Sequence, residues 1–282
     1  MIARLEGIEV RRHGRRDLDG VDLAVGPGQL AAVVGGDGAG KTTLLRVLVG
    51  VVRATAGTVQ VPRREHIGYA AAGSGVYPDL TVEENLRFAA ASYGVRGRRF
   101  EQRRRQLLEA TDLGSARDRL ASQLSGGMRQ KLAFACVMLH GPELLVMDEP
   151  TTGVDPVSRS ELWSLVSTAV AEGTAAVFST TYVNEAARAD HMLVLDRGRV
   201  LTAGAPERIR TTLPGRVIAV TADDVTADHP GLVTWRRGGE RHAWLAGGAP
   251  PVGATPVEPD LEDAVIVAAL AAATSAWPQV PA

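Results

Sequence analysis

Cysteine and lysine are both scarce in this 282-residue chain. The one cysteine, Cys136, has no partner for an internal disulfide, and its apolar setting in LAFACVML favours a buried core residue over a reactive thiol. The only lysines are Lys41 and Lys131, among 31 basic residues. Basic and acidic residues nearly balance, at a formal net charge of −1, so no global field draws the chain toward nucleic acid or anionic lipid. We therefore expect no nucleic-acid partner.

Long apolar runs are also missing. The N-terminal stretch MIARLEGIEVRRHGRR contains no apolar core of a signal peptide, so we expect the chain to stay in the cytoplasm. The longest apolar run, AVIVAALAAATSAW from Ala264, is shorter than the ~20 residues that span a bilayer. Any work at a membrane would then need a partner that supplies the membrane spans.

Strand-like and helix-like segments alternate along most of the chain, which predicts an α/β fold with a largely parallel sheet. We expect strands at residues 30–34, 66–70, 144–148 and 175–180, helices at 41–52 and 158–173, and a hairpin at 191–201. Residues from about 213 onward differ in pattern. Short strands within 216–222, 231–237 and 241–247 and a helix at 258–272 predict a small α+β appendage, for which an extra dimer contact is the simplest role.

A helical insertion interrupts the strand pattern from Gly73 to about Gly114. Its first helix is expected to begin at Thr81, whose hydroxyl can cap the helix while Glu84 completes a capping box. The basic run RGRRFEQRRRQ, residues 96–106, is interpreted as a solvated helix face, with a patch that contacts a partner as the alternative.

The stretch GGDGAGKTT fits the phosphate-loop pattern G-x-x-x-x-G-K-[ST] and lies between an apolar strand and a helix. Glycines let the backbone turn its N–H groups toward a nucleotide phosphate at the positive end of the helix. Lys41 is expected to reach the β- and γ-phosphates, and Thr42 to bind Mg²⁺. The predicted nucleotide-binding residues of this phosphate loop are Gly35, Gly36, Asp37, Gly38, Ala39, Gly40, Lys41, Thr42 and Thr43.

Two further stretches carry groups suited to phosphoryl transfer. LLVMDEP is an apolar strand that ends in Asp148, a candidate Mg²⁺ ligand, and Glu149, which is placed to polarise an attacking water as the catalytic residue. In LSGGMRQ, Ser125 with Gly126 and Gly127 caps another helix and offers a second set of N–H groups to a phosphate. One nucleotide rarely needs two phosphate cradles, so we expect a dimer in which each ATP lies between one chain's phosphate loop and the other chain's LSGGMRQ.

These motifs, followed by TTGVD and taken in this order and spacing, resemble the ATP-binding subunits of ABC transporters. The resemblance implies a P-loop NTPase cassette over residues 1–212, with a parallel-sheet core, an antiparallel β subdomain and a helical subdomain at about 73–135. Residues 213–282 would form the accessory domain and tail. Asp155 would contact nucleotide within the TTGVD loop. The later EPDLEDA is similar to an ending found in the branch that serves drug and polysaccharide exporters.

The same resemblance implies ATP and Mg²⁺ as ligands, an integral-membrane permease as partner, and a peripheral position on the cytoplasmic face of the cell membrane. It also marks three departures. Ala72 stands where the family has a glutamine that senses the γ-phosphate, and Thr181 stands where a switch histidine positions it. His13 takes the place of the aromatic residue that stacks on adenine, with an exposed loop histidine as the equal alternative.

Losing a positioned acid/base group typically costs ~10²–10⁴ in rate, so we expect slow turnover at this chain's own site. LSGGMRQ is intact, whereas Ala72 and Thr181 replace two residues that the family uses to sense ATP. This combination favours a heterodimer with a second ATPase subunit that keeps both residues, and a homodimer is the alternative. An ATP-dependent regulatory or assembly switch without transport is the alternative function. A soluble ATPase acting on DNA or ribosomes is disfavoured, because the chain has one cassette and no long coiled-coil insertion.

Overall fold

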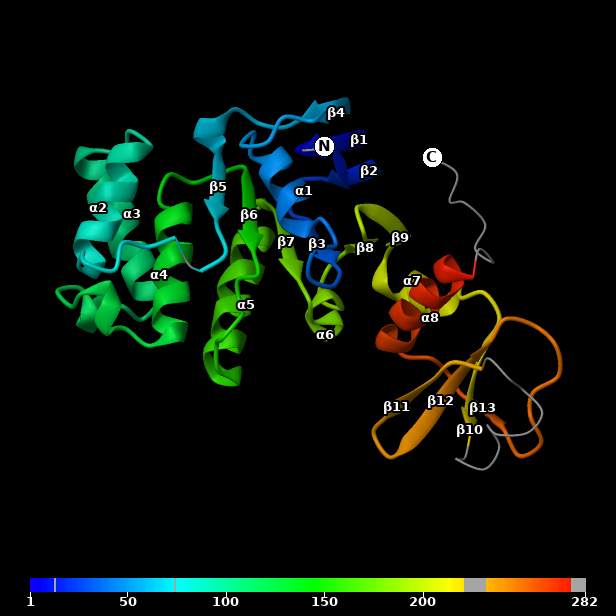
Figure 1. Cartoon of the computed structure of the whole chain (residues 1–282). Coiled ribbons are helices and arrows are strands. Elements are labelled where there is room, and N and C mark those ends of the chain that lie inside the picture. The colour runs from blue at the N-terminus through cyan, green and yellow to red at the C-terminus, as the bar shows by residue number, and fades with distance from the viewer. Residues whose placement is uncertain (13, 74, 221–231, 275–282) are drawn as a thin grey trace.

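The computed structural model describes residues 1–12, 14–73, 75–220 and 232–274, and its strands form three β-sheets (Figure 1). The central sheet has the strand order β5-β6-β7-β3-β8-β9; all pairs are parallel except β8 with β9. This confirms the predicted α/β class. Its strands are β3 (Leu30–Val34), β5 (Ile67–Ala70), β6 (Leu144–Asp148), β7 (Ala175–Thr180), β8 (His191–Asp196) and β9 (Arg199–Gly204).

An antiparallel sheet covers one side of this core. It has the order β2-β1-β4, with β1 (Ala3–Arg12), β2 (Arg15–Val25) and β4 (Ala56–Gln60), and it packs with α1 (Lys41–Leu48). Strand β3 is buried on both faces: Ala31 and Val33 pack toward this side, and Ala32 and Val34 pack into the cluster formed with the helices opposite. Helix α1 ends before the predicted residue 52 because Gly50 takes a left-handed conformation, with φ 68°.

The helical insertion contains α2 (Val82–Ser92) and α3 (Gly97–Ala110), at the left of Figure 1, and α4 (Gly126–Met138) follows it. Short 3₁₀ turns lie at Gly114–Ala116 and Ala121–Gln123, and a third, Arg64–His66, precedes β5. The predicted capping box is confirmed. Thr81 N donates to Glu84 Oε2 at 2.8 Å, and Glu84 N donates to Thr81 Oγ1 at 3.1 Å.

The interpretation of the basic run as a solvated face is wrong for Arg103 and Arg104, which are half-buried, whereas Arg99 is exposed as expected. Arg99 Nη2 donates to His140 O at 3.0 Å, and Arg103 Nη2 donates to Met138 O at 2.8 Å. Arg104 Nη1 lies 2.7 Å from Oε2 of the buried Glu83. The contacts of Arg99 and Arg103 satisfy carbonyls at the C-terminal end of α4, which hydropathy patterns do not reveal.

Two buried side chains in this region bear on chemistry. Cys136 is partly buried against the main apolar cluster, and burial raises the pKa of its thiol to about 12, so it stays protonated as expected of a core residue. His140 is buried and stacks on Tyr93 with ring centroids 3.6 Å apart. Neither ring nitrogen of His140 has a hydrogen-bond partner within the described residues, and burial lowers the pKa of this imidazole to about 4.

The His140 imidazole should make folding stability fall with acid. Its unfolded-state pKa is about 6.5, so between pH 6.5 and 4 the unfolded chain takes up a proton that the folded chain excludes. The stabilisation is complete above pH 6.5, and up to about 3 kcal/mol is lost as the pH falls toward 4. Urea unfolding between pH 7.5 and 4.5 measures the loss. His140→Phe keeps a ring on Tyr93 and should show a shallower dependence; equal dependences would contradict the prediction.

The remaining helices of the cassette lie against the central sheet. They are α5 (Pro156–Ala171), α6 (Val183–Ala186) and α7 (Pro206–Thr211). Beyond them, a four-stranded antiparallel sheet has the order β11-β12-β10-β13, followed by α8 (Leu261–Ala273). The strands are β10 (Arg216–Val220), β11 (Thr234–Arg237), β12 (Glu240–Leu245) and β13 (Thr255–Pro256). The first three match the predicted segments, and the two-residue β13 was not expected. We name this sheet the accessory sheet.

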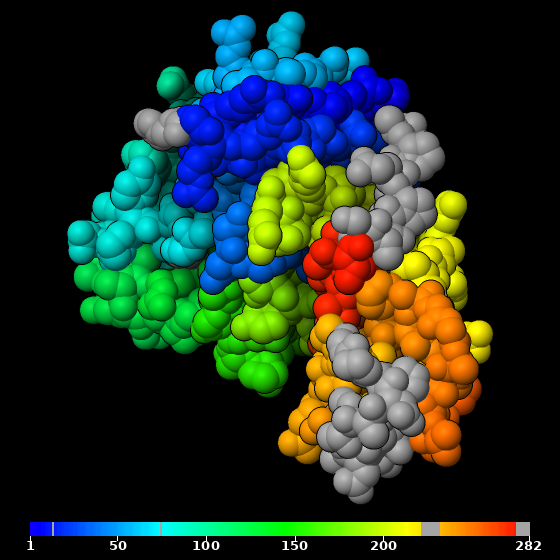
Figure 2. Space-filling view, turned by 45° about the vertical axis from the view of Figure 1, so that its right-hand side comes forward, coloured from blue at the N-terminus to red at the C-terminus, as the bar shows by residue number. Residues whose placement is uncertain are grey.

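Helix α8 belongs to two apolar clusters at once. Ala264 and Ala268 are buried in the same cluster as Ala186 of α6. On the other side of the helix, Val267 packs with Trp244 of the accessory sheet. Figure 2 shows α8, in red, between the yellow-green strands and the orange accessory sheet. Within the described ranges, no helix combines the length and apolarity that crossing a bilayer requires.

Candidate functional site

The carboxyl ends of three neighbouring strands meet at one edge of the central sheet. The phosphate loop, residues 35–43, follows β3, the two carboxylates end β6, and Thr181 follows β7 (Figure 1). The carboxyl edge of a parallel sheet is where open α/β folds bind their ligands. The topology therefore brings together segments that lie more than a hundred residues apart in sequence.

A hollow of about 670 Å³ opens over the phosphate loop. Its lining includes most of the phosphate loop, one of the two carboxylates, and basic residues from β1, β2 and the β8–β9 turn. The lining residues are Arg12, Arg15, Arg16, Asp17, Gly36, Asp37, Gly38, Ala39, Gly40, Lys41, Thr42, Thr43, Glu149 and Arg197. All of the predicted loop residues except Gly35 therefore form one wall of a single hollow.

Two glycines of the phosphate loop are required by its geometry. A side chain at Gly35 would overlap the Leu195 carbonyl oxygen, and Gly40 has φ 110° with Asp17 O only 2.9 Å from the place of a Cβ. Gly40 is also the N-cap of α1 and makes no side-chain cap, so N–H groups at this helix end are left for a ligand.

Lys41 is buried within the loop that it would serve. Its Nζ donates to Gly35 O at 2.8 Å and to Gly36 O at 3.2 Å, and lies 3.2 Å from Glu149 Oε1. Only 5% of the side chain is exposed. An anionic phosphate that enters the hollow would therefore meet an ammonium group already held in position.

Asp148 has one satisfied and one free carboxylate oxygen. Its Oδ1 accepts from Thr42 Oγ1 at 3.2 Å and from Ser179 Oγ at 2.6 Å. Its Oδ2 is buried and has no hydrogen-bond partner among the described residues. A free carboxylate oxygen beside a threonine hydroxyl is the oxygen-rich donor set that Mg²⁺ prefers, so the residues fit this ion.

Glu149 adopts a left-handed backbone conformation, with φ 49°, that is uncommon outside glycine. Its backbone N donates to Ser179 Oγ at 2.9 Å, and its Oε2 accepts from Thr152 Oγ1 at 3.2 Å. The side chain is 25% exposed at the wall of the hollow, where it can act on a water molecule.

Sequence reasoning gave Ser179 no role, although its Oγ contacts both Asp148 and the backbone of Glu149. The one signal for it is a polar residue near the end of the apolar strand AAVFST.

LSGGMRQ and Asp155 lie outside the lining of this hollow, at the N-termini of α4 and α5. Ser125 Oγ accepts from Met128 N at 3.2 Å, as the predicted cap requires. A side chain at Gly127 would overlap Ser158, so this helix start packs closely against α5. Hydrogen bonds from Ser158 lower the pKa of Asp155, which keeps it a carboxylate. The exposed Ser125 and the half-buried Gly126 are accessible to a second molecule.

The positions that depart from the expected pattern also lie outside the lining. Ala72 and Thr181 are exposed, on the segments that follow β5 and β7. His13 lies outside the described residues. Its neighbour Arg12 does line the hollow, pairs with Asp17, and donates from Nη2 to Thr43 Oγ1 at 3.3 Å.

Sequence reasoning missed a set of arginines around the hollow. The run RRHGRR was the one signal for three of them, and Arg197 had none. Together with Lys41 these arginines outnumber the three acidic residues of the lining, and this positive balance suits a polyphosphate ligand. The arginines are Arg12, Arg15, Arg16 and Arg197.

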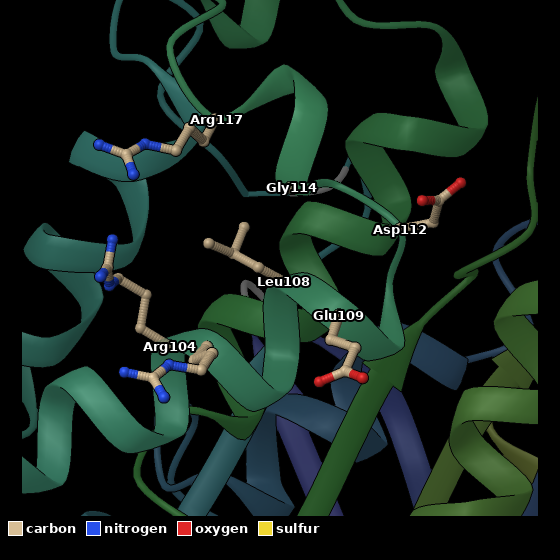
Figure 3. Close-up of a pocket in the computed structure, with 7 residues that line it drawn as sticks. Arg104, Leu108, Glu109, Asp112, Gly114 and Arg117 are labelled. Carbon is tan, nitrogen blue, oxygen red and sulfur yellow. The ribbon is translucent and has the colours of Figure 1, made fainter.

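A second hollow, of about 430 Å³, lies on the helical insertion (Figure 3). Figure 3 shows Leu108 at its centre, with Arg117 and Glu109 on either side. Arg104, in its wall, is already paired with Glu83 and Glu101. This hollow contains no residue of the nucleotide motifs, so the hollow over the phosphate loop is the candidate nucleotide site.

Comparisons with known proteins agree with this geometry. The ABC transporter family profile matches residues 18–152. The chain is 39% identical over 232 residues to the daunorubicin resistance ATP-binding protein DrrA2 of Streptomyces coeruleorubidus, covering 78% of this chain and 72% of that protein. It is 38% identical over 230 residues to the probable multidrug ABC transporter ATP-binding protein YbhF of Escherichia coli K12, covering 77% of this chain but only 40% of YbhF.

Solved structures point the same way. The chain superimposes on a structure described as the ATP-binding subunit of an ABC transporter with a TM-score of 0.68 and 28% identity, covering 74% of this chain and 92% of that one. The sequence relatives, the shared fold and the phosphate loop facing Asp148 and Glu149 lead to one conclusion. The chain belongs to the family of ABC transporter ATP-binding proteins.

Proposed function

We propose that this chain binds and hydrolyses ATP as the motor subunit of a membrane exporter, with a separate integral-membrane permease as its partner. The observation that carries the proposal is that Lys41 and Glu149 line one hollow, while Asp148 accepts a hydrogen bond from Thr42 of the same lining. Relatives named for daunorubicin resistance and for Nod factor export support the exporter class. The subunit would work at the cytoplasmic face of the membrane.

Four residues at or beside the hollow have named roles in this proposal: Lys41, Thr42, Asp148 and Glu149. Lys41 and the N–H groups at the start of α1 bind the phosphates, and Thr42 with Asp148 holds Mg²⁺. The ion supplies positive charge that offsets the charge on the phosphate oxygens. Glu149 takes a proton from the attacking water. Its carboxylate lies 3.2 Å from Lys41 Nζ, a contact that holds the Glu149 side chain beside the phosphate loop.

The dimer is part of the same proposal. Ser125, Gly126, Gly127 and Asp155 lie outside the chain's own hollow, so they would serve the nucleotide site of an opposing cassette. The dimer can be a homodimer or a heterodimer with a second, fuller ATPase subunit. Mass photometry of the chain bound to its membrane subunit separates the two, since only the heterodimer contains a second type of cassette.

We further propose that residues 1–212 form the ATP-binding domain and residues 213–282 an accessory domain and tail. The accessory sheet begins at Arg216, after α7, which supports this boundary. On the helical insertion, Tyr77 and Phe88 are 49% and 47% exposed and their rings lie 4.6 Å apart. An exposed aromatic pair of this kind supports a protein contact there, and the permease is the proposed partner.

Restoring the residues that the family has at positions 72 and 181 tests the proposed activity. Ala72→Gln with Thr181→His should raise ATP turnover by about 10²-fold, because the pair restores a γ-phosphate sensor and a positioned imidazole. Phosphate release at saturating ATP and Mg²⁺ measures the change, with Glu149→Gln as the blank. Wild-type turnover equal to that of the restored chain would show that Ala72 and Thr181 are tolerated. A wild type and a restored chain that both match the blank would refute ATP hydrolysis.

A further inference from the structure

Glu185, in α6, is a buried carboxylate to which the nucleotide motifs assign no role. Only 3% of the residue is exposed. Its Oε1 accepts from Thr151 Oγ1 at 2.6 Å, and its Oε2 accepts from Thr180 Oγ1 at 2.8 Å. Both threonines are themselves buried. Each carboxylate oxygen is therefore held by a different segment of the chain.

The two threonines belong to the segments that carry the proposed chemistry. Thr151 lies two residues after Glu149, and its backbone O accepts from Val154 N at 3.1 Å, in the loop that leads to Asp155. Thr180 directly precedes Thr181, and its Oγ1 accepts from Tyr182 N at 3.0 Å. Glu185 thus joins the loop at 149–155 to the switch segment, residues 180–186.

Arg159 of α5 completes the connection. Its Nε lies 3.6 Å from Glu185 Oε1, which places a positive charge beside the buried carboxylate. Its Nη2 donates to Val154 O at 3.3 Å, and its guanidinium carbon lies 5.4 Å from the centre of the Tyr182 ring. The same arginine thus contacts both segments that Glu185 joins, so the carboxylate is paired and its position is fixed.

We propose that Glu185 is a positioning residue for ATP hydrolysis, which acts by holding the loop of Glu149 and the switch segment at a fixed spacing. The inference rests on the proposed ATPase function. Glu185 does not line the hollow and acts through Thr151 and Thr180. With threonine in place of an imidazole at position 181, the position of the switch segment is set by this buried contact rather than by a long side chain at the nucleotide.

Kinetics of matched variants test the proposal. Thr151→Val and Thr180→Val each remove one hydroxyl at nearly constant size, and Thr→Ser at the same positions keeps it. Each valine variant should lower kcat about tenfold and leave KM for ATP within about twofold, because misplacement slows the chemical step while Lys41 still binds phosphate. The serine variants should restore kcat. Turnover is divided by the number of ATP sites titrated, so a loss of folded protein does not register.

Replacing Glu185 itself separates geometry from charge. The amide of Glu185→Gln can accept from one threonine and donate to the other, so kcat should stay within about threefold of wild type. Glu185→Ala breaks both contacts and should lose at least tenfold. A glutamine variant as slow as the alanine variant, an unchanged kcat in both valine variants, or serine variants that fail to restore kcat would overturn the proposal.

Amide hydrogen exchange tests the same contact without turnover. Thr180→Val should speed exchange about tenfold in residues 150–155 as well as in 180–186, because Glu185 joins the two segments. Faster exchange confined to 180–186 would refute the coupling. If wild-type turnover equals that of the Glu149→Gln blank, the proposed function fails, and the exchange result alone decides whether Glu185 couples the segments.

Discussion

Glu149→Gln is expected to lower ATP turnover by ~10²–10⁴-fold while leaving ATP binding intact. The amide has the size of the carboxylate and can still accept the Thr152 hydroxyl, but it cannot take a proton from water. Lys41 keeps its contacts with the Gly35 and Gly36 carbonyls, so the phosphate-binding wall persists. Binding without hydrolysis should leave the variant as an ATP-bound dimer.

Phosphate release and ATP-dependent dimerisation measure the two halves of this expectation. Glu143→Gln is a matched control, because Glu143 is an exposed carboxylate that pairs with His66 away from the hollow. The control should turn over ATP as the wild type does. A Glu149→Gln variant that hydrolyses ATP at the control rate would show that another group is the base.

Lys41→Ala is expected to weaken ATP binding by about 100-fold or more. The substitution removes a buried ammonium group from the wall of the hollow, and each charge-assisted hydrogen bond to phosphate contributes ~1.5–3 kcal/mol. It also leaves Glu149 without its counter-charge, so the empty site becomes less favourable to an anion.

Equilibrium binding of ATP, by calorimetry or a fluorescent analogue, gives the change in Kd. The chain supplies its own control, because its other lysine, Lys131, pairs with Glu161 at 2.9 Å and does not line the hollow. Lys131→Ala should bind ATP as the wild type does. Unchanged affinity in Lys41→Ala would refute the assignment of the site.

The nucleotide motifs could be predicted because each is local. The phosphate loop is set by backbone turns at Gly35 and Gly40, and the predicted cap at Ser125 needs only a backbone N–H three residues later. The sheet followed from its apolar strands, whose buried faces leave little alternative register. Sequence could therefore give the wall of the hollow and the α/β class.

The supporting contacts could not be predicted, because they join residues far apart in sequence. Ser179 meets Asp148 across 31 positions, and Glu185 meets Thr151 across 34. Ser and Thr occur mostly at exposed positions, so a motif gives no sign that these are buried. Arg103 of α3 was misinterpreted for a related reason, since its partner is a helix-end carbonyl that carries no side-chain signature.

Helix α8, near the C-terminus, covers apolar residues of both the cassette and the accessory sheet. Loss of α8 by a proteolytic cut before Leu261 would uncover Ala186 of the switch segment and Trp244 of the accessory sheet together, because α8 packs on both. Newly exposed apolar surface of this kind favours aggregation. Such a cut would therefore damage the nucleotide-binding part of the protein even though every one of its motifs would still be present.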